Sequence, residues 1–143
     1  MNRLSGLTLL FVATTAWGAE TFDGNKPMVC AAERGHDCLP TQQSCKPLKP
    51  EAGKDLNLYI DVQAMSVKSP YRNDTLPIAS FAFNDKSLVL QGTSLQLVWS
   101  ATVHRTTGRL SVAITDREGA YVIFGQCKLA TGADKPAVSK PGS

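Results

Sequence analysis

The chain has 143 residues, of which 43% are hydrophobic and 19% charged, and its formal net charge is +3. This length suits one domain with a modest core. The small positive charge is spread along the chain without a basic run, which argues against nucleic acid or an anionic membrane as the partner.

Residues 1–19 have the pattern of a signal peptide. Arg3 supplies a positive start, an apolar run covers residues 7–13, and small residues around Trp17 allow cleavage after Gly18 or Ala19. The apolar run is shorter than the roughly 20 residues that a membrane-spanning helix needs. We therefore expect an exported protein without stable membrane insertion, located in the periplasm or secreted.

Residues 20–54 differ in composition from the rest of the chain. They hold three of the four cysteines and several prolines, and they lack any sustained hydrophobic periodicity. We expect an irregular, disulfide-braced arm here, in which residues 27–32 could form a first strand or one helical turn.

From residue 56 onward, apolar and polar side chains alternate in short runs, as they do in β-strands. We expect about six strands, near residues 56–64, 78–83, 87–91, 95–104, 109–115 and 120–124. Short polar turns join them, so the strands should pair antiparallel. The predicted fold class is all-β: a single domain over residues 20–129 in which a meander forms a small barrel or a strongly curled sheet.

Three details complete this prediction. Trp99 is expected in the core, because it shares a strand face with the apolar residues Leu95, Leu97, Ala101 and Val103. The run 120–124 is apolar on both faces, which predicts a strand covered on both sides, for instance by the arm. Residues 130–143 are rich in Gly, Pro, Ser and Lys and are expected to form a disordered tail.

Four cysteines in an exported domain of this size indicate two disulfides, for which three pairings are possible. We favour Cys38–Cys45, which closes a short loop containing Pro40, and Cys30–Cys127, which pins the arm to the last strand. The spacing matches no common zinc pattern, and no CxxC or CxxCH motif is present. No metal and no cofactor are therefore expected.

Few residues point to catalysis. His36, His104 and Asp37, which follows His36, are the only candidate acid–base groups, and no GxSxG turn accompanies them. We expect no catalytic site. Tyr59, on the opposite face from its apolar neighbours, and Tyr71, in the longest loop between strands, are candidate surface contacts.

Three stretches together resemble one protein family. Residues 21–30 carry an FDGxKPxxC opening, residues 107–109 read TGR, and residues 124–127 read FGQC. In this pattern the chain resembles a family of small, uncharacterised secreted proteins of proteobacteria. The resemblance implies a bacterial periplasmic location and paired cysteines, and it carries no activity.

These observations favour a non-enzymatic binding or interaction module with a periplasmic or cell-envelope protein as its partner; the oligomeric state is left open. One alternative is a small-ligand carrier with an internal pocket, ranked lower because a barrel needs about eight strands to hold one ligand. A cavity beside Trp99 would raise that alternative above the first. The least favoured alternative is a hydrolase that uses the two histidines.

Overall fold

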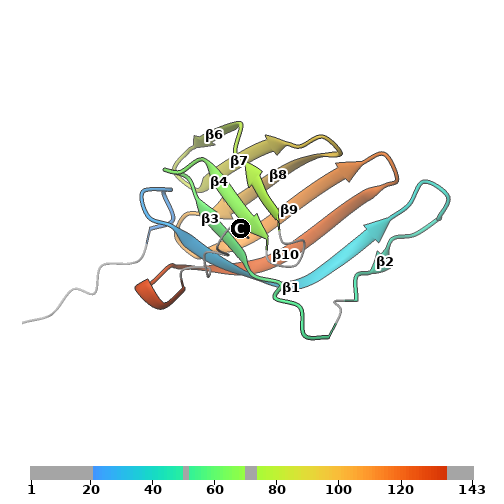
Figure 1. The fold of residues 1–143 in the computed structure, drawn as a ribbon, viewed down its shortest axis with the longest axis horizontal. Helices are drawn as coiled ribbons and strands as arrows, with labels where there is room; N and C mark the ends of the chain where they lie inside the picture. Colours follow the sequence, from blue (N-terminus) through green and yellow to red (C-terminus); the bar gives the residue numbers. More distant parts are fainter. Residues whose placement is uncertain (1–20, 50–51, 70–73, 135–143) are drawn as a thin grey trace, which may run out of the picture.

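The computed structural model describes residues 21–49, 52–69 and 74–134, which form one antiparallel sheet (Figure 1). The strands of this part are β1 (Met28–Cys38), β2 (Lys46–Pro47), β3 (Leu58–Asp61), β4 (Ser66–Ser69), β5 (Asp74–Pro77), β6 (Ser80–Phe83), β7 (Ser87–Thr93), β8 (Leu97–His104), β9 (Arg109–Asp116) and β10 (Ala120–Leu129), followed by the 3-10 helix η1 (Gly132–Asp134). Nine strands follow in the order β5-β4-β3-β1-β10-β9-β8-β7-β6, and β2 pairs beside β1. The predicted fold class, a strongly curled all-β sheet, is confirmed.

The largest departure from the prediction is β1, an eleven-residue strand in the segment expected to be irregular. It pairs with β10 along its whole length and with β3 at Met28–Cys30. A bulge at Glu33 shifts the register between Ala32 and Arg34. Because the bulge and the polar residues after it interrupt the alternation, the sequence pattern alone does not reveal this strand.

The strands at the two ends of the ladder, β5 and β6, are neighbours along the chain. Between them, Ile78 donates its N–H to the carbonyl of Met65 at 2.9 Å, beside β4. The next residue, Ala79, donates its N–H to the carbonyl of Gln91 on β7 at 2.8 Å. The chain therefore changes pairing partner at this corner, and the change brings the two ends of the curled sheet together.

This corner changes how many strands form the wall. If β5 and β6 are counted as two halves of one bent strand, the nine strands of the path make eight wall strands. About eight strands is the number at which a β-barrel interior can be filled by side chains or can hold one small ligand. The expected number of about six strands was too low, because β1, β4 and β5 show little alternation of apolar and polar residues.

The apolar core lies on the inner face of the curl. Buried and more exposed residues alternate along β8, where Leu97, Trp99, Ala101 and Val103 all face inward. Trp99 is 4% exposed, which confirms its predicted place in the core. Leu95, expected on the same face, precedes β8 and is fully exposed.

Both favoured disulfides are present. Cys30 and Cys127 lie directly opposite each other on β1 and β10, and the bond links residues 97 apart in sequence. Cys38–Cys45 closes the short connection between β1 and β2. The first disulfide therefore joins strands from opposite ends of the domain, whereas the second constrains only a local loop.

The doubly apolar run of β10 is explained differently from the prediction. Residues 120–124 are all half-buried, and β1 lies beside them as a paired strand rather than across one face. Tyr121 and Ile123 face the inside of the curl. On the outer face, the guanidinium of Arg34 lies 5.1 Å from the ring centroid of Phe124, a cation–π contact that partly covers that ring.

The predicted signal peptide, residues 1–19, lies outside the described residues, as do residues 135–143 of the predicted tail. The first part of that tail is structured: Ala130 donates its N–H to the carbonyl of Pro27 at 2.9 Å, and η1 follows. Residues 21–49, 52–69 and 74–134 contain no helix long and apolar enough to cross a membrane.

The two disulfides should differ in their effect on stability. Replacing Cys30 and Cys127 together with Ser should lower the free energy of unfolding by about 4.7 kcal/mol, because a long loop in the unfolded chain is released. The Cys38→Ser/Cys45→Ser variant should lose only about 2.5 kcal/mol, since its loop is short. Urea unfolding of both variants measures the difference, and a larger loss in the second variant would contradict the assignment.

Candidate functional site

The inner face of the curled sheet surrounds a cavity of about 360 Å³. Its wall is made mainly of apolar side chains from strands on both sides of the curl, namely Leu58, Ile60, Val67 and Leu76 from the β3–β5 side and Trp99, Ala101, Val112, Ile114, Tyr121 and Ile123 from the β8–β10 side. The cavity lies beside Trp99, the position at which a cavity was expected to favour the small-ligand carrier.

Strand register explains why these side chains meet. The inward positions of β8, β9 and β10 align in two rows across the sheet, Trp99–Ile114–Tyr121 and Ala101–Val112–Ile123. The second row continues onto β1 at Gly35, which pairs with Ile123. At its other side the row continues onto β7 at Leu90, which pairs with Ala101. Ala101 and Gly35 are therefore the small residues within a row of larger apolar side chains, and the side chains of β8 and β1 leave space on the inner face at these two positions.

The cavity opens at the end where β1 extends beyond β3. β3 pairs only with Met28–Cys30, whereas β1 continues toward β2, away from the green strands β3–β5 in Figure 1. Glu33, Leu48 and Lys49 line this end and are exposed, while Trp99 and Ala101 are buried. The mouth therefore lies at this end, where the second half of β1 and the segment after β2 border it together.

Trp99 forms part of the closed end of the cavity. Its ring lies against Gly92, where an added Cβ would come within 2.5 Å of two ring carbons and would also clash with the carbonyl oxygen of Pro77. The indole Nε1 is buried and has no hydrogen-bond partner among the described residues. Because this nitrogen is buried, the ring presents carbon atoms to the cavity.

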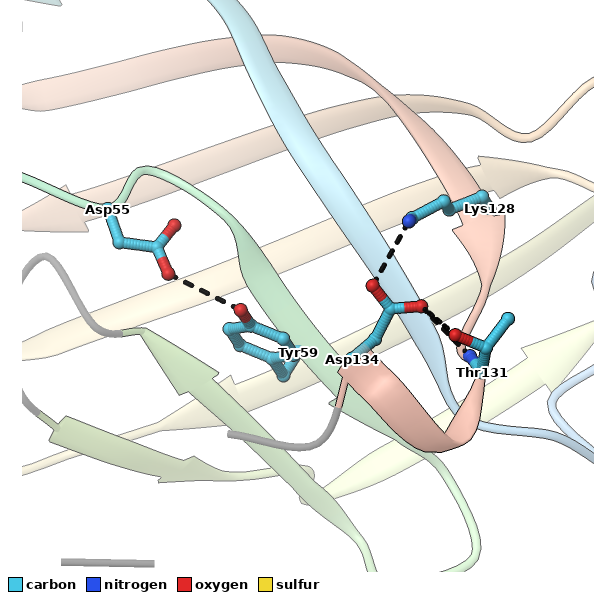
Figure 2. Close-up of polar contacts among 5 residues, drawn as sticks. All are labelled: Asp55, Tyr59, Lys128, Thr131 and Asp134. Atoms are coloured by element: carbon cyan, nitrogen blue, oxygen red, sulfur yellow. Dashed lines mark hydrogen bonds and ion pairs between the residues drawn. The ribbon is translucent and has the colours of Figure 1, made fainter. Parts of the chain in front are cut away.

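A second, more polar groove of about 380 Å³ lies on the outer face, between β3 and the C-terminal turn. Tyr59, predicted as a surface contact, lines this groove and donates its hydroxyl to Asp55 at 3.3 Å (Figure 2). Burial, followed by the negative charge of Asp55, raises the pKa of Tyr59. The Tyr59 hydroxyl therefore already has a hydrogen-bond partner within the chain.

The other side of this groove is closed by the turn that contains η1 (Figure 2). Asp134 accepts hydrogen bonds from the N–H of Thr131 at 2.9 Å and from its hydroxyl at 2.7 Å, and Lys128 Nζ lies 3.0 Å from the same carboxylate. The Thr131 N–H, then its hydroxyl, then Lys128 lower the pKa of Asp134 to about 2. These contacts fasten the C-terminal turn to β10 and leave the inner cavity as the better candidate site.

The candidate acid–base residues are not brought together. His36 pairs with Val122 on β10, and β9 separates that strand from β8, where His104 lies. His36 and Asp37, as successive residues of one strand, point to opposite faces. His104 Nδ1 accepts the N–H groups of Thr106 and Thr107, each at 3.3 Å, in its own turn. Tyr71, the remaining candidate, lies outside the described residues.

The cavity residues were predicted as core rather than as a site, because inward alternation looks the same for a filled and a hollow sheet. The available signal was the pair of small inward residues, Ala101 and Gly35.

In the described part of the chain, no three His, Cys, Asp or Glu side chains gather as a metal site would require.

Comparisons with protein-family models, with curated proteins and with solved structures give no match to this chain.

The C-terminal turn should respond to acid in a defined range. The folded pKa of Asp134, about 2, is below its ordinary value of 3.8, so the contacts are complete above 3.8 and are lost as the pH falls through about 2. In an NMR titration, the amide signal of Thr131 should shift with pH, and the midpoint of this shift should lie at a pH of about 2. Asp134→Asn should remove this transition, and a midpoint at 3.8 would contradict the contacts.

Proposed function

We propose that this protein is an exported, non-enzymatic binding protein that holds a small apolar molecule inside its curled sheet. The observation that carries the proposal is the apolar cavity of about 360 Å³ beside Trp99. Ligand pockets commonly span about 300–1,000 Å³ and have mostly apolar walls with few polar groups. This cavity favours the small-ligand carrier over the interaction module that the sequence alone favoured.

The composition of the wall indicates what such a ligand would be. No polar or charged residue is buried among the described residues, so the deep part of the cavity offers mainly carbon surface. Polar and charged residues join the lining only as Glu33, Arg34, Lys49, Ser69 and Tyr121, none of which is buried. The cavity volume of about 360 Å³ lies near the lower end of the range of about 300–1,000 Å³ that small-molecule pockets span. We infer a compact apolar ligand whose polar group, where it has one, stays at the mouth.

Several features support an exported protein. Two disulfides in a small domain are typical of an oxidising compartment. Residues 1–19 have the pattern of a signal peptide. The resemblance to small secreted proteobacterial proteins supports the periplasm as the location. No catalytic function is proposed, because His36 lies on β1 and His104 on β8, and these two strands are not neighbours in the sheet.

The cavity proposal is tested by filling the cavity from one strand position. Ile114→Trp places a larger side chain in the wall, whereas Ala113→Trp places the same side chain on the exposed outer face of β9. Titration with N-phenylnaphthylamine, an uncharged apolar fluorophore, should show binding to the unmodified chain. Ile114→Trp should weaken this binding by at least about tenfold, or about 1.4 kcal/mol.

Ala113→Trp is the matched control and should bind as the unmodified chain does. Thermal unfolding of both variants checks that each is folded. Equal binding by the two folded variants, or no binding by the unmodified chain, would refute the proposal.

One observation favours an interaction module as the second candidate. All four residues of β6 are exposed, and Phe81 and Phe83 are 44% and 61% exposed. In the described ladder β6 is a terminal strand that pairs with β7, and such an edge can accept a strand from another chain. The contact of Arg105 with Phe83, at 5.4 Å from the ring centroid, leaves most of that ring accessible.

This second candidate predicts a different mutational pattern. Phe81→Ser with Phe83→Ser should abolish recovery of a partner from periplasmic extract, because it removes both aromatic side chains from the edge. Val98→Ser, which also replaces an exposed apolar residue but lies on β8, should retain the partner. The same proteins captured by all three forms would exclude β6 as the contact.

A further inference from the structure

The mouth of the cavity is bordered by a short segment, Cys45–Lys49, that we call the strap. It contains β2, which pairs with β1 only at two positions, His36–Pro47 and Asp37–Lys46. Beyond β2, Leu48 donates its N–H to the carbonyl of Gly35 at 2.9 Å. Leu48 and Lys49 then line the cavity. The strap therefore forms part of the wall at the open end.

Leu48 occupies the space that Gly35 leaves on the inner face. A Cβ at Gly35 would lie 2.8 Å from Leu48 Cδ1, so the leucine packs where a side chain of β1 would otherwise stand. Gly35 pairs with Ile123, the last inward side chain of its row. Leu48 thus completes this row from outside the main ladder, and it can leave without breaking the pairing of β1 with β10.

Little holds the strap apart from one covalent bond. Every residue from Cys45 to Lys49 is exposed, and Pro47 has no N–H to donate to the ladder. Segments with few buried contacts and few backbone hydrogen bonds open locally at low free energy. The Cys38–Cys45 disulfide is the contact that ties the start of the strap to the end of β1.

The two disulfides differ in their access to a reductant. Cys30 and Cys127 are 0% and 3% exposed, whereas Cys45 is exposed and Cys38 is half-buried. Thiol–disulfide exchange requires a thiolate to reach one sulfur of the bond. A reductant in solution can therefore reach Cys45 and is kept away from Cys30 and Cys127.

We propose that the Cys38–Cys45 disulfide is a redox latch on the cavity, and that its reduction frees the strap and lets the ligand exchange faster. The latch rests on the ligand-binding function proposed above, and its reductant is a dithiol. One thiolate of the dithiol attacks Cys45 Sγ, the Cys38–Cys45 bond breaks, and Cys38 leaves as a thiolate that takes up a proton. The second thiol of the reductant then attacks the mixed disulfide and releases Cys45, so two electrons pass to the protein and the reductant becomes a disulfide.

The experiment uses the full chain in its oxidised form and after treatment with dithiothreitol, with N-phenylnaphthylamine as the probe. Mass spectrometry after thiol labelling should find Cys38 and Cys45 modified and Cys30 and Cys127 unmodified. Stopped-flow release of the probe should be at least about tenfold faster after reduction, because a freed strap lowers the barrier that the probe crosses on leaving the cavity. The Cys38→Ser/Cys45→Ser variant should release the probe at the fast rate without reductant.

Two leucine variants distinguish gating of the cavity by the strap from a general loss of stability of the domain. Leu48→Ala removes the side chain that borders the cavity and should speed release with the disulfide intact. Leu95→Ala, which alters a fully exposed leucine outside the cavity lining, should not change the rate. A release rate that stays the same in the reduced chain and in Leu48→Ala would overturn the latch.

A readout without ligand distinguishes failure of the latch from failure of the binding function. Reduction should speed hydrogen exchange at the Leu48 amide and leave the amides of buried Val103 and Leu110 unchanged. If no form binds the probe but Leu48 responds, the strap is latched as proposed and the ligand-binding function is wrong. If Leu48 does not respond, the latch is wrong whether or not the probe binds.

Discussion

The pairing of β1 with β10 is the constraint on which the rest of the structure depends. β1 lies between β3 and β10 in the ladder, so the continuous strand pairing that joins the β3–β5 part of the sheet to the β6–β10 part runs through it. The two strands come from opposite ends of the domain, and closing such a long loop costs chain entropy that only the completed sheet offsets. The buried Cys30–Cys127 bond sits in this ladder and keeps the two halves of the curl together.

Sequence patterns predicted the parts of the fold that local order determines. β7, β8 and β9 alternate clearly because one face packs on the core and the other meets solvent. β1 could not be predicted in the same way, since its strand geometry depends on partners distant in sequence and its alternation breaks at Glu33. The bend at Ile78–Ala79 was equally hidden, because it consists of a change of hydrogen-bond partner and needs no special residue type.

The candidate site was predicted only as core. Trp99 was placed correctly, but the same inward alternation would have served a fully packed interior. What makes the interior hollow is the size of a few inward residues in register across the sheet. Ala101 and Gly35 are the small residues of one row, and their alignment depends on the pairing of four strands. Residue types are readable from a sequence, whereas this alignment is not.

The corner between β5 and β6 is a line of weak pairing in the wall of the curled sheet. Everywhere else along the described path from β5 to β6, adjacent strands share a ladder, but across the corner the two ends of the sheet are linked by the continuing chain and by the bonds of Ile78 and Ala79. Neither disulfide crosses this line. Separating β5 from β7 along this line would therefore break very few hydrogen bonds. The opposite side of the wall is held by the long ladder of β1 with β10 and by the Cys30–Cys127 bond.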